Sequence, residues 1–126
     1  MREIFDHRTN PAHEGVVITA VDEPGAGGAC NQYRISGPVV EGGLFFSSGA
    51  EVIKFQNGTV GEHGLNGLTH EILLAIVIDR LRSFQDGPFA CRENALALTK
   101  LEEAMNWLHS RSKNRIRRGV EGKSEA

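Results

Sequence analysis

The densest apolar pattern of the chain lies in residues 68–119 and predicts a helical hairpin. Thr69 is a suitable N-cap, and the run 72–78 after it is apolar on almost every side of a helix. The tripeptide Asp86-Gly87-Pro88 ends this helix, with its glycine suited to a left-handed cap and its proline unable to continue. Since the next helix begins within about five residues, the two should lie antiparallel. A helix this apolar must be covered by the N-terminal half, by other subunits or by both.

The second helix of the hairpin begins as an apolar seam and ends in cationic residues. The seam has spacings of 3, 4 and 3, typical of a helix packed along one line, and consists of Leu98, Leu101, Met105 and Leu108. Further on, Arg111, Arg115 and Arg118 share one face. Five of the eight residues 111–118 are cationic, and no acidic residue at helical spacing neutralises them. The run is either a solvated helix end that suits the C-terminal dipole or a site where arginine binds phosphate.

The N-terminal part, residues 1–60, predicts a small antiparallel sheet with a glycine-rich loop, so the fold class is α+β. The expected strands are the β-branched or aromatic runs 16–21, 33–35, 44–46 and 52–56. Asn57-Gly58 is a strong hairpin signal and predicts a return strand at Thr59 and Val60. Residues 61–67 are the expected connector to the hairpin, and residues 120–126 an expected frayed tail of one structural domain.

Length and charge limit the classes of function. The 126 residues suit one compact domain. The net charge of -2 hides an asymmetry: residues 1–68 hold 4 Lys+Arg against 8 Asp+Glu, and residues 69–126 hold 10 against 8. Such a local basic surface suits a small anionic ligand better than a long nucleic acid. The sequence has no transmembrane run or signal peptide, and its two cysteines fit no disulfide framework, so we expect an intracellular protein without membrane contact.

Catalytic and cofactor motifs are absent from the sequence. The loop 24–30 only partly matches GxGxxG, because its last glycine is missing and a strand is expected after it. This loop is either a flexible turn or a backbone that approaches a ligand. The five histidines lack zinc-ligand spacing, and neither Cys30 nor Cys91 has an identifiable histidine partner. We therefore expect no enzyme, no catalytic residue, no metal and no cofactor.

Phe84 and Asn94 form the candidate pocket of the hairpin. Phe84 closes the first helix and Asn94 opens the seam of the second, so the two should face each other near the turn. They are either a core aromatic beside a satisfied amide, or a pocket in which a base stacks on the ring and the amide contacts its edge. Burying the amide without a partner would cost about 1–3 kcal/mol, which favours a ligand or a bound water there.

Several short segments form a recognisable set. They are Asp-Arg-Leu at 79–81, Phe-Gln-Asp-Gly-Pro-Phe at 84–89, Arg-Glu-Asn at 92–94, Leu-Glu-Glu-Ala at 101–104, Arg-Arg-Gly-Val-Glu-Gly at 117–122, the loop 22–29 and Phe-Gln-Asn-Gly at 55–58. This set resembles the phage anti-Thoeris signal-sponge family, which is related to anti-CBASS cyclic-nucleotide sponges. The resemblance covers most of the chain apart from residues 1–15.

The resemblance implies a homo-oligomer, a dimer or a hexamer built through the helices, that binds immune nucleotide second messengers and sequesters them uncleaved in the cytoplasm of the infected bacterial host. The implied ligands are glycocyclic ADP-ribose isomers and cyclic di- and trinucleotides. Carried over residue by residue, Phe84 would stack an adenine and Asn94 would hydrogen-bond the ADP-ribose ligand. Arg111 and Arg115, with Arg118 beside them, would line a second site where three subunits gather the phosphates of a cyclic trinucleotide.

Further contacts to the first pocket are expected from the glycine loop, namely from Asp22, Gly27, Gly28 and Asn31. Two alternatives to a sponge stay open. An enzyme that degrades such nucleotides would turn its ligand over. A small nucleic-acid-binding regulator that uses the arginine face would bind long polymers with a steep salt dependence.

Overall fold

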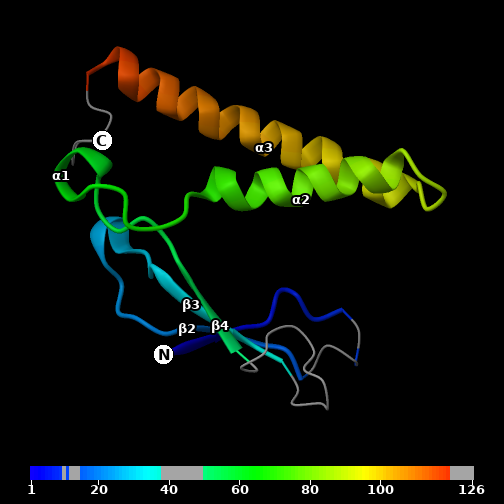
Figure 1. Ribbon diagram of the computed structural model, residues 1–126, viewed down its shortest axis with the longest axis horizontal. Coiled ribbons are helices and arrows are strands. Elements are labelled where there is room, and N and C mark those ends of the chain that lie inside the picture. The colour runs from blue at the N-terminus through cyan, green and yellow to red at the C-terminus, as the bar shows by residue number, and fades with distance from the viewer. Residues whose placement is uncertain (10, 12–14, 38–49, 120–126) are drawn as a thin grey trace. The chain divides into compact units, whose positions relative to one another are not determined.

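The computed structural model describes residues 1–9, 11, 15–37 and 50–119 and has an N-terminal antiparallel sheet followed by helices (Figure 1). The predicted α+β class is confirmed. The chain divides into two units, Met1–Gly58 with Leu65–Gly67 and Thr59–Gly64 with Leu68–Ala126. Each unit is described below by itself.

The sheet of the first unit has four antiparallel strands in the order β1-β2-β3-β4. They are β1 (Arg2–Ile4), β2 (Val17–Ala20), β3 (Gln32–Ser36) and β4 (Ala50–Lys54). Because residues paired across antiparallel strands share a face, the register gathers apolar side chains on one side of the sheet. These are Ile4, Ile18, Ala20, Tyr33, Ile35 and Ile53. The alternation of apolar and polar residues along the strands therefore gives the sheet one face suited to burial.

Most of the sheet was predictable from its β-branched runs. The runs 16–21, 33–35 and 52–56 overlap β2, β3 and β4, although β4 both begins and ends two residues before the predicted run, at Ala50 and Lys54. β1 escaped prediction because a strand of three residues shows no period. The predicted run 44–46 lies outside the described residues.

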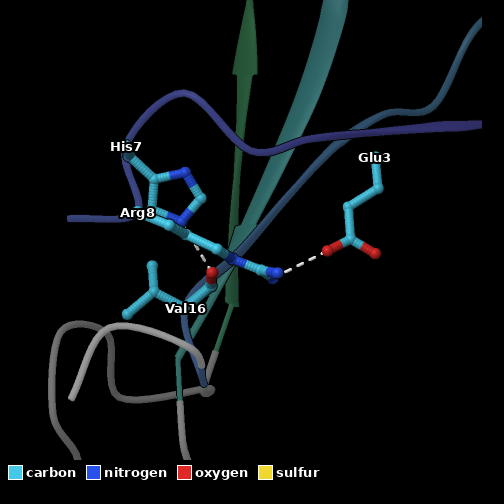
Figure 2. A network of polar contacts seen from close by, with 4 residues as sticks. All are labelled: Glu3, His7, Arg8 and Val16. Atoms are coloured by element: carbon cyan, nitrogen blue, oxygen red, sulfur yellow. Dashed lines mark hydrogen bonds and ion pairs between the residues drawn. The ribbon is translucent and has the colours of Figure 1, made fainter. Parts of the chain in front are cut away.

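Polar contacts hold the segment after β1 against the start of β2 (Figure 2). His7 Nε2 donates to the carbonyl oxygen of Val16 at 2.8 Å, and Arg8 Nη2 lies 2.7 Å from Glu3 Oε2. The guanidinium carbon of Arg8 also lies 4.9 Å from the ring centre of Phe5. These contacts anchor an edge strand that is short on its own.

The return strand predicted at Thr59 and Val60 is wrong, because Val60 begins the short helix α1 (Val60–His63). The backbone of Asn57 bonds instead to the side chain of Asn66. The Asn57 backbone N–H donates to Asn66 Oδ1, and the Asn57 backbone carbonyl accepts from Asn66 Nδ2, both at 2.8 Å. Gly58 has the positive φ, 79°, that this dipeptide favours. The turn signal of Asn57-Gly58 is therefore correct. The side chain of Asn66, however, supplies the hydrogen-bond partners that a return strand would have supplied.

The second unit contains α1 and the hairpin of α2 (His70–Gln85) and α3 (Arg92–Arg117), which lie side by side (Figure 1). The predicted cap is confirmed, since Thr69 Oγ1 accepts from the Ile72 N–H at 3.3 Å. Ile78 is buried in α2, and Arg82 Nη2 reaches Glu102 Oε2 on α3 at 2.8 Å. The seam residues of α3 are all half-buried, namely Leu98, Leu101, Met105 and Leu108. The apolar seam and one ion pair thus join the two helices.

The turn between α2 and α3 is closed by the Gln85 side chain. Gln85 Nε2 donates to the carbonyl of Cys91, and the Cys91 N–H donates to Gln85 Oε1, both at 3.1 Å. The left-handed conformation expected of Gly87 is wrong, because Gly87 is absent from the described glycines with positive φ and the C-cap is Asp86 in the right-handed helical region. The glutamine supplies polar partners in this turn, so no left-handed glycine is needed there.

Gly67 permits a close backbone contact within the first unit. A Cβ at this position would meet the carbonyl of Phe55 and lie 2.6 Å from the nitrogen of Gln56. Since backbone atoms cannot move aside without displacing the chain after β4, Gly67→Ala should lower the free energy of unfolding by about 1–3 kcal/mol. Urea denaturation followed by circular dichroism measures this loss.

Gly87→Ala is the control for this substitution. Its Cβ would have its nearest neighbour, the Ser83 carbonyl oxygen, at 3.5 Å, and the backbone φ at Gly87 is not positive. We expect the free energy of unfolding to change by no more than about 0.5 kcal/mol. Equal losses in the two variants would contradict the role given to Gly67.

Candidate ligand-binding site

A hollow of about 560 Å³ lies on the hairpin, between one face of α2 and the turn that follows it. Its lining consists of Ile76, Asp79, Arg80, Ser83, Phe84, Gly87, Pro88 and Phe89. The α2 members recur at spacings of three and four residues because such positions share a helix face. A largely apolar wall with a few polar groups is the usual composition of a small-molecule site.

Phe84 is the aromatic platform of this hollow, and Arg80 lies over it. The guanidinium carbon of Arg80 is 5.0 Å from the centre of the Phe84 ring. The two residues are four positions apart on α2, where side chains meet, and the ring quadrupole attracts a cation at this distance. The hollow therefore combines a stacking surface with a positive charge.

Two large apolar side chains are exposed beside this platform. Ile76 on α2 is 61% exposed, and Phe89 in the turn is 73% exposed. Apolar side chains that stay open to solvent at a concave surface indicate a binding region. A planar ligand that stacks on Phe84 would find further apolar surface at both.

Asn94 does not line this hollow within a single chain. It is half-buried in the first turn of α3, where its backbone N–H lies 3.5 Å from the Cys91 sulfur. Its side-chain amide has no hydrogen bond to the described part of the chain. The hairpin thus leaves the Asn94 amide available but does not bring it into the hollow that Phe84 lines.

The three arginines of the predicted second site differ in their surroundings. Arg111 on α3 and Arg118 at its C-cap are exposed, whereas Arg115 is only 7% exposed. Arg115 takes part in a polar or charged interaction, as burial of a guanidinium requires. The face predicted from helical spacing is therefore accessible at two positions and buried at the middle one.

A second hollow, of about 480 Å³, lies on another side of α3 and is lined by polar residues. They are Asn106, His109, Ser110, Lys113, Asn114 and Arg117. Because α-helical residues turn by about 100° each, Lys113 and Arg117 lie largely opposite Arg111 and Arg115. The cations at the end of α3 thus occupy two faces.

Asp22 shapes the glycine loop of the first unit. Its carboxylate accepts from the Asn31 N–H at 3.1 and 2.9 Å and from the Gln32 N–H at 3.0 Å. These hydrogen bonds, above all the one from Asn31, lower the pKa of the Asp22 carboxyl below its ordinary 3.8. The Asp22 carboxylate is therefore engaged by its own loop.

The other predicted loop residues follow from this geometry. Gly27 and Gly28 have φ values of 76° and 83°, a conformation that side chains disfavour, and a Cβ at either would meet nothing within 4 Å. Asn31 Nδ2 lies 3.4 Å from the Ala29 carbonyl oxygen. The four predicted residues thus share one loop of the first unit, while Phe84 and Asn94 belong to the second.

Sequence reasoning assigned only Phe84 of the lining residues to a site, and Arg80 and Phe89 are the most consequential of those it missed. The spacing of four between Arg80 and Phe84 was a usable signal, since it places an arginine beside an aromatic ring on a helix. Phe89 follows the proline of the turn, and only the path of the turn places it at the hollow.

Among the residues that the structure describes, no group of three His, Cys, Asp or Glu side chains could hold a metal ion. None of the described helices combines the length and the apolar character needed to cross a membrane.

The model of the Acb2/Tad1 hairpin domain matches residues 49–112, which contain all of α2 and most of α3. The chain belongs to the Acb2/Tad1 hairpin family. The family resemblance inferred from the sequence is thereby confirmed. Of the candidate ligand residues, Phe84, Asn94 and Arg111 lie inside the matched part of this family member, and Arg115 and Arg118 lie just beyond it.

The chain is similar to Thoeris anti-defense 1 of Bacillus phage SBSphiJ7. It is 52% identical over 80 residues, which make up 64% of this chain and 56% of that protein. The present chain therefore spans little more than half the length of this curated relative.

The Asp22 carboxyl should titrate below pH 3.8, because backbone hydrogen bonds favour its charged form. A lowered folded-state pKa stabilises the fold above the unfolded value, and this contribution disappears as the pH falls through the folded value. In an NMR titration, the Asn31 and Gln32 amide signals should shift with that low midpoint. Asp22→Asn should abolish the shift, and a midpoint at or above 3.8 would contradict the assignment.

Proposed function

We propose that this chain is a phage anti-defence protein that binds immune nucleotide second messengers and holds them without cleavage, in the cytoplasm of the infected bacterial host. The observation that carries the proposal is the hollow on the hairpin, where Phe84 offers a stacking face and Arg80 a positive charge. Membership of the Acb2/Tad1 hairpin family and the printed name of the phage relative, an anti-defence protein, support it. The ligands proposed for this hollow are glycocyclic ADP-ribose isomers.

The chemistry of such a ligand matches the hollow. Adenine can stack on the Phe84 ring, and stacking of a base on an aromatic side chain contributes about 1–3 kcal/mol. A sponge must compete with a sensor for a scarce signal, and binding at 1 nM needs about -12 kcal/mol. Stacking alone falls well short of that, so phosphate contacts and exclusion of water must supply the rest.

Exclusion of water is the reason to propose a homo-oligomer, either a dimer or a hexamer, built through the helices. The hairpin leaves large apolar side chains exposed along both helices and in the turn between them, and these are Ile72, Ile76, Val77, Phe89, Leu96, Trp107 and Ile116. A second copy that covered part of this surface would close the open side of the hollow. Since Asn94 does not line the hollow of its own chain, its proposed ligand contact depends on such an assembly.

Arg111, Arg115 and Arg118 are proposed to serve a separate site for cyclic trinucleotides, with the phosphates gathered where three subunits meet. The exposure of the Arg111 and Arg118 side chains supports this proposal. Arginine suits the role through its paired hydrogen bonds to phosphate oxygens. Cyclic dinucleotides are proposed for the Phe84 hollow, and ligands of both kinds would extend the inhibition from Thoeris to CBASS.

The two sites should be separable by substitution. Phe84→Ala should weaken binding of a glycocyclic ADP-ribose isomer by about 5- to 150-fold, since one stacking interaction is lost, and should leave cyclic-trinucleotide binding unchanged. Calorimetric titration of both ligands measures this. Leu65→Ala removes an exposed apolar side chain of the first unit that lines neither of the two hollows described, and it is the control. Equal loss of both ligands in a folded Phe84→Ala protein would contradict the two-site proposal.

Storage without chemistry is tested by releasing the ligand. After incubation with a glycocyclic ADP-ribose isomer and heat denaturation, chromatography should recover the unaltered ligand in stoichiometric amount, with or without added Mg²⁺ or Mn²⁺. Hydrolysis needs a positioned base and an activated water, so a degrading enzyme would yield linear or dephosphorylated product beyond one equivalent per site. That product would overturn the proposal in favour of the enzyme.

A further inference from the structure

The two arginines of α2 have different partners, although they are only two positions apart. Arg82 Nη2 is held by Glu102 Oε2 at 2.8 Å, so its charge joins α2 to α3. Arg80 forms no ion pair with any residue in the described ranges, and its guanidinium carbon lies 5.0 Å from the centre of the Phe84 ring. The charge of Arg80 is therefore available to a ligand, and that of Arg82 is not.

Arg80 occupies the surface that a base would use. A guanidinium over an aromatic face at an exposed site is held there only weakly. Its paired hydrogen bonds to a phosphate are stronger, because both partners are charged and the planar fork matches two phosphate oxygens. A ligand with both a base and a phosphate can therefore offer the Phe84 ring a new partner and the Arg80 guanidinium a better one.

The charge balance of the hollow strengthens this argument. Its described lining contains one cation, Arg80, and one anion, Asp79. Without Arg80 the lining would carry a net negative charge, and a phosphate placed there would be repelled. Discrimination between a phosphorylated and an unphosphorylated ligand at this hollow thus depends on one side chain.

We infer that Arg80 is the specificity-determining residue of the Phe84 hollow: its guanidinium leaves the ring when a ligand binds, the base takes its place on Phe84, and the freed guanidinium binds a phosphate of the same ligand. This inference rests on the proposed function and deepens it. This exchange of partners makes the hollow selective, because a nucleoside without phosphate must displace the guanidinium and offers it no new partner.

The experiment compares two probes, a glycocyclic ADP-ribose isomer and adenosine, which shares the base and lacks phosphate. Arg80→Gln should weaken binding of the ADP-ribose isomer at least tenfold, as measured by calorimetry. The same variant should bind adenosine as well as or better than the unaltered chain, as followed by NMR shifts of the Phe84 ring. Arg80→Lys keeps the positive charge but not the planar guanidinium, and its affinity for the ADP-ribose isomer should lie between those of the unaltered chain and Arg80→Gln. Asp79→Asn should bind the ADP-ribose isomer severalfold more tightly.

Arg82→Gln is the matched control, because it removes the same charge from the same helix but outside the hollow. Arg82→Gln should leave the affinity for both probes unchanged. A loss of adenosine equal to the loss of the ADP-ribose isomer in Arg80→Gln would show that Arg80 only supports the ring, and an unchanged affinity for both would show that it has no role. Either result overturns the inference. Failure of the unaltered chain to bind the ADP-ribose isomer would instead overturn the proposed function.

Discussion

Helix α2 carries more apolar surface than α3 can cover, and the features of the hairpin depend on this imbalance. Ile78, near the middle of α2, is buried at 4% exposure, while Ile72, Ile76 and Val77 around it remain exposed. A helix apolar on nearly all sides cannot hide its surface against one neighbour. The uncovered side ends at Phe84, where it becomes one wall of the hollow. The apolar surface of α2 that α3 leaves uncovered therefore also supplies apolar lining to the hollow.

The turn after α2 converts this apolar side into a concave site. The paired hydrogen bonds between Gln85 and Cys91 hold the six residues 86–91 in a closed loop. Pro88 and Phe89 lie in that loop and line the hollow together with Phe84. The side-chain amide of Gln85 thus closes the turn. Because Gln85 is the last residue of α2, these hydrogen bonds at the end of the helix also fix the shape of the hollow.

Arginine has four different roles in this hairpin. Arg82 joins the two helices through Glu102, Arg80 lies over an aromatic ring, Arg115 is buried, and Arg111 is exposed. Charge alone is the same in all four positions. What differs is the neighbour that each guanidinium meets, and this neighbour decides whether the charge stabilises the fold or stays available to a phosphate.

The sequence by itself determined the elements with a strong local cause. Thr69 and the apolar run after it specify where α2 begins, the seam from Leu98 to Leu108 specifies the inner side of α3, and the β-branched runs specify three of the four strands. Each is a repeat or a cap, and its physics acts within a few residues. The family could be recognised for the same reason, because its motifs are short and contiguous.

Only the tertiary structure decided where chain segments distant in sequence take each other's hydrogen bonds and surface. The Asn66 side chain bonds to the Asn57 N–H and carbonyl, which a return strand after Asn57-Gly58 would otherwise have paired. Burial separates Arg115 from Arg111, although helical spacing makes them equivalent. Phe84 lines a hollow that Asn94 does not, since a shared end of a hairpin is not a shared surface. These outcomes depend on competition between partners, and a local pattern carries no information about which partner wins.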